Sequence, residues 1–124
     1  MKAIIRFATY RVEAQLYDTP TGRAVYDALP IQQNVNRWGD EIYFGIDLKA
    51  ELEEGARAEV SEGELGYWPN MPAFCIFFGA TPLSKGNEPV AASAVNVFGR
   101  LVKVEPDVLR RIPDGENVTV ERPD

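Results

Sequence analysis

Aromatic side chains concentrate around one uncharged segment of the chain, LGYWPNMPAFCIFF, which runs from Leu65 to Phe78. Tyrosine and tryptophan rings combine a large apolar contact area with a polar group, which suits a flat ligand or a peptide segment. Packing in the interior of the protein is the alternative use of such residues. The side chains that could form an aromatic groove are Trp38, Tyr43, Tyr67, Trp68, Met71 and Phe74.

Tyr67 and Trp68 are adjacent, so their side chains cannot point to the same face of an extended segment. Successive side chains of a β-strand point to opposite faces of the sheet, so at most one of the two rings lies inside the protein. The other ring lies outside or on a loop, where a large exposed aromatic is more informative about binding. The sequence leaves open which of the two faces a groove.

Charged residues near these aromatics offer two further candidates for ligand binding, Glu41 and Arg100. Asp40 and Glu41 form a carboxylate pair close to Arg37, and two carboxylates beside an aromatic could perform acid–base chemistry. The alternative is a capped turn, with Asp40 bonded to backbone N–H groups and Arg37 paired at the surface. Arg100 could anchor a ligand carboxylate at the rim of a barrel, or it could be an ordinary exposed strand residue.

Several classes of catalytic site are excluded by composition, because the chain has no histidine and one cysteine. Ser-His-Asp triads, Cys-His dyads and histidine zinc sites cannot form. Cys75 has no partner for a disulfide or a shared metal, so we interpret it as a small buried apolar residue. The acidic stretch between residues 51 and 64 has no EF-hand spacing. We therefore expect no catalytic residue, no metal and no cofactor.

The overall composition is that of one globular domain spanning residues 1–124, with 45% hydrophobic and 26% charged residues. The net charge of −6 disfavours nucleic-acid binding, because an acidic surface repels phosphate groups. No apolar run is long enough to span a bilayer, and the first ten residues do not resemble a signal peptide. We expect a cytoplasmic protein without a membrane partner. The sequence does not indicate an oligomeric state.

Hydrophobic alternation with a period of two residues dominates the chain and predicts eight or nine short antiparallel strands. AFCIFFG is apolar at every position and predicts a central strand that is covered on both faces. Thr19, Pro20 and Pro30 delimit a predicted helix over residues 20–29. The side chains expected in the core include Val12, Ala14, Leu16, Phe44, Ile46 and Val97.

Strands that recur every eight to twelve residues, without a repeated βαβ unit, favour a closed or nearly closed antiparallel barrel, because closure removes exposed strand edges. A turn at Trp38-Gly39-Asp40 and a bulge at Gly99 are expected within this barrel. The segment ATPLSKGNEPVA predicts a long surface loop.

Four segments, LYDTPTGRAVYDALP, WGDEIYFGI, GELGYWPNMPAFCIFFGATP and VNVFGRL, follow one another in an order and at a spacing that resemble the atypical cyclophilin-like family of prokaryotes. The resemblance covers about residues 14–101. It implies a mainly β fold, namely a closed antiparallel eight-stranded cyclophilin-like barrel with one or two short capping helices. It also implies that Tyr67 and Trp68 lie at the edge of the groove, with AFCIFF along its floor.

The resemblance does not extend to the residues that make cyclophilins prolyl isomerases. The Gln-Gly-Gly-Asp-Phe turn of those enzymes is absent, since RWGDEIYF is shorter and carries Glu41 in place of the phenylalanine. The histidine of the proline pocket is also absent.

We therefore predict a cyclophilin-like barrel that binds a small molecule or a peptide segment in an aromatic groove. A weak peptidyl-prolyl isomerase is the first alternative. An interaction module without a pocket ligand is the second, and it gains if the aromatics are fully packed and the loop ATPLSKGNEP forms an oligomer contact.

Overall fold

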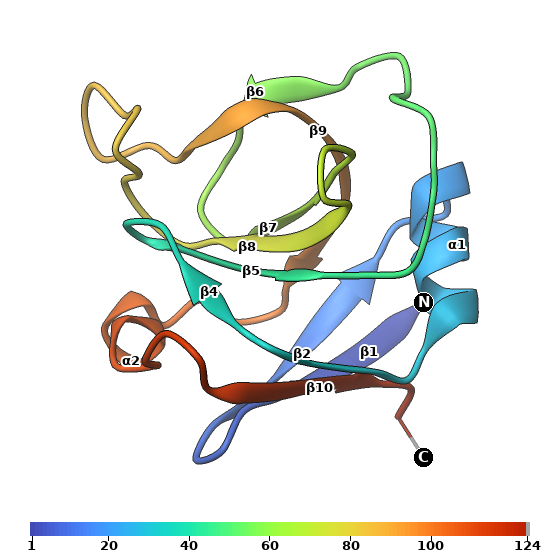
Figure 1. Ribbon diagram of the computed structural model, residues 1–124, viewed down its shortest axis with the longest axis horizontal. Helices are drawn as coiled ribbons and strands as arrows, with labels where there is room; N and C mark the ends of the chain where they lie inside the picture. Colours follow the sequence, from blue (N-terminus) through green and yellow to red (C-terminus); the bar gives the residue numbers. More distant parts are fainter. Residues whose placement is uncertain (124) are drawn as a thin grey trace.

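The computed structural model describes residues 1–123, which form one antiparallel sheet and two short helices (Figure 1). The helices are α1 (Pro20–Ala28) and α2 (Pro106–Arg110). The ten strands are β1 (Lys2–Arg6), β2 (Arg11–Leu16), β3 (Ile31–Asn34), β4 (Asn36–Arg37), β5 (Glu41–Gly45), β6 (Arg57–Glu59), β7 (Glu64–Trp68), β8 (Ala73–Phe77), β9 (Val90–Leu101) and β10 (Asn117–Glu121).

The sheet is strongly curved, but hydrogen bonds do not close it into the predicted eight-stranded barrel. Its strand order is β3-β10-β1-β2-β9-β7-β8-β5-β4, and β6 pairs with β9 beside this path. The two edge strands, β3 and β4, are consecutive segments that only Val35 separates. They follow one another along the chain instead of lying side by side, so no ladder of hydrogen bonds joins them. The prediction of a closed barrel with eight strands was therefore wrong, while the mainly β architecture is confirmed.

The main core lies on the inner, concave face of this sheet. Phe44 stacks on Phe74 with ring centroids 4.8 Å apart, and Phe74 meets Phe98 edge to face at 5.0 Å. The predicted core positions in β2 and β5 and the following residue, Ile46, are buried in the same cluster, as expected from their alternation.

Val97 is an exception among the predicted core residues, because it is partly buried and packs against a different apolar cluster. The pairing of β7 with β9 explains this result. Leu65 lies opposite Gly99 and Gly66 lies opposite Val97, so Phe98 is the extra residue of a bulge. The bulge reverses the alternation, and Phe98 enters the main core in place of Val97. The bulge predicted at Gly99 is confirmed within one residue.

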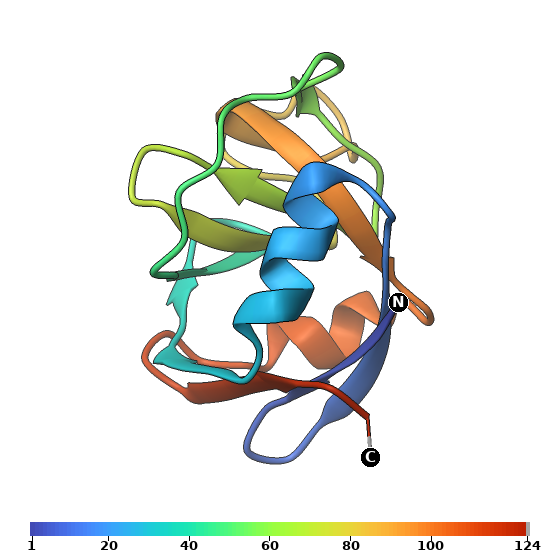
Figure 2. The ribbon, with the colours of Figure 1, turned by 90° about the vertical axis from the view of Figure 1, so that its right-hand side faces the viewer.

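The helix predicted over residues 20–29 is present as α1 and lies across one open end of the curved sheet (Figure 2). The Thr19 hydroxyl accepts a hydrogen bond from the backbone N–H of Gly22 at 3.0 Å, and Pro20 occupies the first turn. A β-carbon at Gly22 would lie 2.0 Å from the Tyr17 carbonyl oxygen, so only glycine permits this close approach. The second helix, α2, lies at the opposite end of the sheet (Figure 1).

A second, smaller apolar cluster covers the outer face of β7 and β8. Its buried members are Val60, Ala73, Cys75, Phe77, Ala91 and Val95. The first half of β9, together with β6, curls over this outer face and supplies part of the cluster (Figure 1). Every residue of β8 is consequently buried, which confirms the predicted central strand with cover on both sides. No helix within residues 1–123 is long and apolar enough to cross a membrane.

Hydrogen bonds of the Tyr67 hydroxyl attach the long connection between β5 and β6 to the core, and a substitution of Tyr67 tests how much they stabilise the fold. Its buried hydroxyl donates to the Leu48 carbonyl at 2.8 Å and accepts from the Ala50 N–H at 3.0 Å. We expect Tyr67→Phe to lower the free energy of unfolding by about 1–3 kcal/mol, because both backbone groups lose their partner. Urea denaturation measures this change. Tyr17→Phe, at a half-buried tyrosine, is the control and should change stability by less than about 0.5 kcal/mol; an equal effect of both variants would contradict the assigned role of Tyr67.

Candidate functional site

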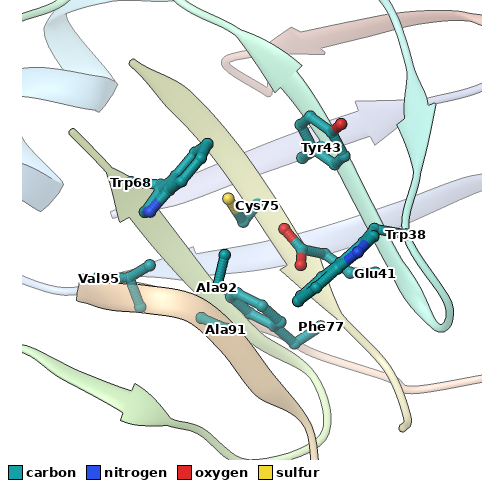
Figure 3. A pocket seen from close by; sticks show the side chains of 9 residues that line it. All are labelled: Trp38, Glu41, Tyr43, Trp68, Cys75, Phe77, Ala91, Ala92 and Val95. Carbon is teal, nitrogen blue, oxygen red and sulfur yellow. The ribbon is translucent and has the colours of Figure 1, made fainter. Parts of the chain in front are cut away.

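A cavity of about 200 Å³ opens beside the second apolar cluster, on the outer face of β5, β7 and β8 (Figure 3). The first residues of β9 form its remaining wall. Its lining combines aromatic rings with small side chains and one carboxyl group: Trp38, Glu41, Tyr43, Trp68, Cys75, Phe77, Ala91, Ala92 and Val95.

Strand alternation and register place these side chains together. Tyr43 lies opposite Cys75 in the antiparallel pair of β5 and β8, and Glu41 lies opposite Phe77. Directly paired residues point to the same face of a sheet, so all four side chains reach the outer face. Their neighbours in the chain, such as Phe44, point into the main core instead.

Trp38 enters the site from the hairpin that joins β4 to β5. Its N–H and carbonyl group exchange hydrogen bonds with the Glu41 backbone, at 3.0 and 3.1 Å. Gly39, between them, has a φ of 59°, a conformation that glycine adopts without strain. The predicted turn at residues 38–40 is thus confirmed, and it brings the Trp38 ring to the edge of the cavity.

The two tryptophans lie on opposite sides of the cavity, with Glu41 and Cys75 between them (Figure 3). Both rings are half-buried. The Trp68 indole N–H donates a hydrogen bond to the Ser93 hydroxyl at 2.7 Å, which fixes that ring against the start of β9. The question that the sequence left open is thereby answered: Trp68 faces the cavity and Tyr67 faces the main core.

The neighbouring carboxylates of Asp40 and Glu41 have separate environments. Asp40 accepts a hydrogen bond from Arg110 at 3.1 Å and lies 3.9 Å from Arg37, so it belongs to an ion-pair network at the surface. Glu41 points into the cavity and is only 6% exposed. The two groups therefore do not act as a carboxylate pair.

Burial gives Glu41 an unusual charge state. Removal from water raises the pKa of Glu41 from its ordinary value of 4.5 to about 7, and an interaction with the Cys75 thiol offsets part of this rise. Within residues 1–123, no lysine or arginine forms an ion pair with Glu41. Burial, and then the Glu41 charge, raise the pKa of Cys75, so its thiol stays protonated. Cys75 is buried, as its apolar context predicted.

Four of the eight predicted binding residues line this cavity, namely Trp38, Glu41, Tyr43 and Trp68. The other four lie elsewhere. Tyr67 and Phe74 are buried in the main core. Met71 is 48% exposed at the turn between β7 and β8, and Arg100 is an exposed residue near the end of β9.

The lining residues that the sequence analysis did not name as binding residues are Cys75, Phe77, Ala91, Ala92 and Val95. A signal for two of them was present, since Cys75 and Phe77 alternate with Phe74 and Ile76 along β8. The contribution of β9 carried no such signal, because small residues in a long strand do not mark a cavity.

Arg37 cannot provide a cation to the cavity, because its guanidinium group is engaged elsewhere. It donates to the carbonyl oxygens of Ile112 at 2.7 Å, Gly39 at 3.0 Å and Arg110 at 3.1 Å. It also lies over the Phe78 ring, 5.4 Å from the centroid. Arg37 therefore holds α2 and the hairpin together.

Within residues 1–123, no three acidic or cysteine side chains form a cluster that could hold a metal ion.

The raised pKa of Glu41 predicts a pH-dependent effect of Glu41→Gln on stability. A carboxyl group whose pKa is higher in the folded than in the unfolded protein opposes folding once it ionises. The variant should therefore gain stability relative to the parent as the pH rises, by about 2 kcal/mol between pH 5.5 and 8, and the gap should level off above the folded pKa. Urea denaturation across this range is the measurement. The exposed Glu62→Gln variant should show a constant gap; a constant gap for Glu41→Gln would contradict the prediction.

Comparisons with known proteins agree with this architecture. A family model described as Cyclophilin-like matches residues 1–121. The hypothetical protein AF2241 from Archaeoglobus fulgidus, known from its solution structure, is 45% identical, with a TM-score of 0.81 over 99% of this chain and 95% of that chain.

McbB, solved in complex with tryptophan, is 15% identical, with a TM-score of 0.71 over 97% of this chain and 44% of the McbB chain, and this likeness concerns the fold alone. A comparison with curated proteins gives no match. The family match covers nearly the whole chain, beyond residues 14–101 where the sequence motifs lie. The chain therefore belongs to the cyclophilin-like family.

Proposed function

We propose that this protein binds a small molecule, or one side chain of a peptide segment, in the cavity between Trp38 and Trp68. The observation that carries the proposal is an open apolar cavity with an indole ring on each side. Its volume of about 200 Å³ lies below the roughly 300–1,000 Å³ of sites for drug-sized ligands. The site therefore suits a small head group, with the remainder of the ligand outside.

The two tryptophans are not required to fill the main core, which supports a binding role. That core is occupied by other rings, including Tyr67, Phe74 and Phe98. Half-buried indole rings at a cavity leave apolar area in contact with water, and a ligand that covers them would gain about 25 cal/mol per Å². Glu41 adds one carboxyl group to a mostly apolar lining, and a small number of polar groups in such a lining is typical of sites that orient a ligand.

An interaction module without a pocket ligand has less support. That alternative gains from fully packed aromatics, whereas Trp38 and Trp68 are half-buried at an open cavity. Leu83, in the loop between β8 and β9, is 53% exposed, but one exposed leucine is common on protein surfaces.

The proposal generates a binding test with a cavity-filling variant. We expect ligand-observed NMR with a fragment library to detect weak binders. In a separate measurement, these binders should quench the tryptophan fluorescence of the protein, which comes from Trp38 and Trp68. Ala92→Phe places a ring in the lining and should abolish these signals while the protein stays folded. Ala8→Phe, at an exposed position in the turn between β1 and β2, is the matched control and should bind like the parent. Equal binding by the Ala92→Phe variant, or no binder at all, would overturn the proposal.

A second expectation concerns catalysis of prolyl isomerisation. Within residues 1–123, no arginine side chain lines the cavity. Cyclophilins use a groove arginine to donate a hydrogen bond to the prolyl nitrogen, and loss of such a donor costs about 10²–10³ in rate in other enzymes. We expect the protein to accelerate a standard peptide isomerisation assay at least about 100-fold less than a cyclophilin does. A rate comparable with that of a cyclophilin, abolished by Arg37→Ala or Arg100→Ala, would contradict this expectation and establish an isomerase.

A further inference from the structure

We propose that the head group recognised by this cavity is an organic ammonium ion, and that Glu41 is its counter-ion. The inference rests on the proposed binding function and adds the chemical class of the ligand. Three features of the lining carry it: its charge, its aromatic rings and its shortage of polar groups.

Charge is the first feature. Among the described residues that line the cavity, Glu41 is the only one whose side chain can carry a charge at neutral pH, since Cys75 stays protonated and the other members are aromatic or aliphatic. A carboxylate without a basic partner repels anionic ligands. A buried carboxylate has also lost the stabilising interaction with water, and a bound cation of the right size would replace that interaction. The expected ligand is therefore positively charged.

The aromatic rings are the second feature. Indole faces attract organic cations through the negative potential above the ring, and tryptophan is the most effective of the aromatic side chains in this role. Trp38 and Trp68 flank the carboxyl group on two sides, and Tyr43 lies on a third (Figure 3). Alkyl substituents on the nitrogen would contact Ala91, Ala92 and Val95, so the site suits an alkylated ammonium group.

The shortage of polar groups argues against an inorganic cation. Calcium requires six to eight oxygen ligands, and magnesium retains a shell of oxygen ligands with near-octahedral geometry. One carboxyl group and the Tyr43 hydroxyl cannot supply that many oxygen ligands. An organic ammonium ion carries its own apolar shell and needs a single counter-charge. The same head group occurs in small alkylammonium compounds and in alkylated lysine side chains, so the test includes a probe for each source.

Binding should be coupled to the protonation of Glu41. The titratable side chains that line the cavity with it are Cys75 from β8 and Tyr43 from β5, while β7 and β9 contribute none. In the adjoining hairpin, Asp40 is paired with Arg110 and Arg37. A bound cation favours the ionised carboxylate, so below pH 7 the cation must displace a proton. Affinity should rise by up to about tenfold per pH unit below this value and level off above it.

The experiment compares choline with neohexanol, in which a carbon atom replaces the charged nitrogen at nearly unchanged shape. Isothermal titration at pH 8 should give at least about tenfold tighter binding of choline. Glu41→Gln should weaken the binding of choline relative to that of neohexanol about tenfold or more, and it should remove the pH dependence of choline binding. Glu62→Gln, at an exposed position, is the control and should behave like the parent. A peptide with one trimethyl-lysine forms the second arm, beside the same peptide with unmodified lysine.

The outcomes separate this inference from the proposed function. If choline binds more tightly than the trimethyl-lysine peptide, the ligand is a small alkylammonium compound. If the trimethyl-lysine peptide binds more tightly than choline, the ligand is an alkylated side chain of a protein. Equal affinities for choline and neohexanol would leave the binding function intact and overturn the ammonium assignment. The assignment also fails if neither cationic probe binds, and the fragment screen with Ala92→Phe then decides whether the cavity binds any ligand.

Discussion

Burial of both faces of β8 is the constraint on which the rest of the structure depends. All five residues from Ala73 to Phe77 are buried, so neither face of this strand can be exposed to water. Its inner face forms part of the main core through Phe74 and Ile76. Its outer face needs a second cover, which the first half of β9 and the short strand β6 provide. The length of β9 follows from this requirement, because one strand must serve both layers.

The two layers differ in how completely they are filled, and this difference leaves the cavity in which the proposed site lies. Stacked and edge-to-face rings occupy the main core. The outer layer combines small residues with Phe77 and leaves a cavity of about 200 Å³ beside Trp38 and Trp68. Glu41 lies in this layer, where burial of its charge costs free energy that a tightly packed apolar residue would avoid. A buried carboxyl group whose ionisation opposes folding is one of the observations behind the binding role proposed above.

Membership of the cyclophilin-like family determines the architecture but leaves the chemistry to individual side chains. AF2241 shares 45% of its residues with this chain, and McbB shares the fold at 15% identity within a much longer chain. One fold can carry unrelated functions, so a function must be argued from a site and not from the architecture. In this protein the proposed site lies on the outer face of the sheet, whereas Arg37, a residue type that isomerases of this fold use, is engaged in hydrogen bonds that hold α2.

Local sequence patterns by themselves determined most of the strands, the capped helix and the two-sided burial of residues 73–77: the strands from alternation, the helix from Thr19, Pro20 and Pro30, and the burial from an uninterrupted apolar run. They also determined that Tyr67 and Trp68 face opposite ways. Only the tertiary structure decided which faces which side, since register between strands is set by pairing. The same holds for the unclosed sheet edge, for the bulge that turns Val97 out of the core, and for the separation of Asp40 from Glu41. These outcomes depend on contacts between residues far apart in sequence, such as Asp40 with Arg110 and Glu41 with Cys75.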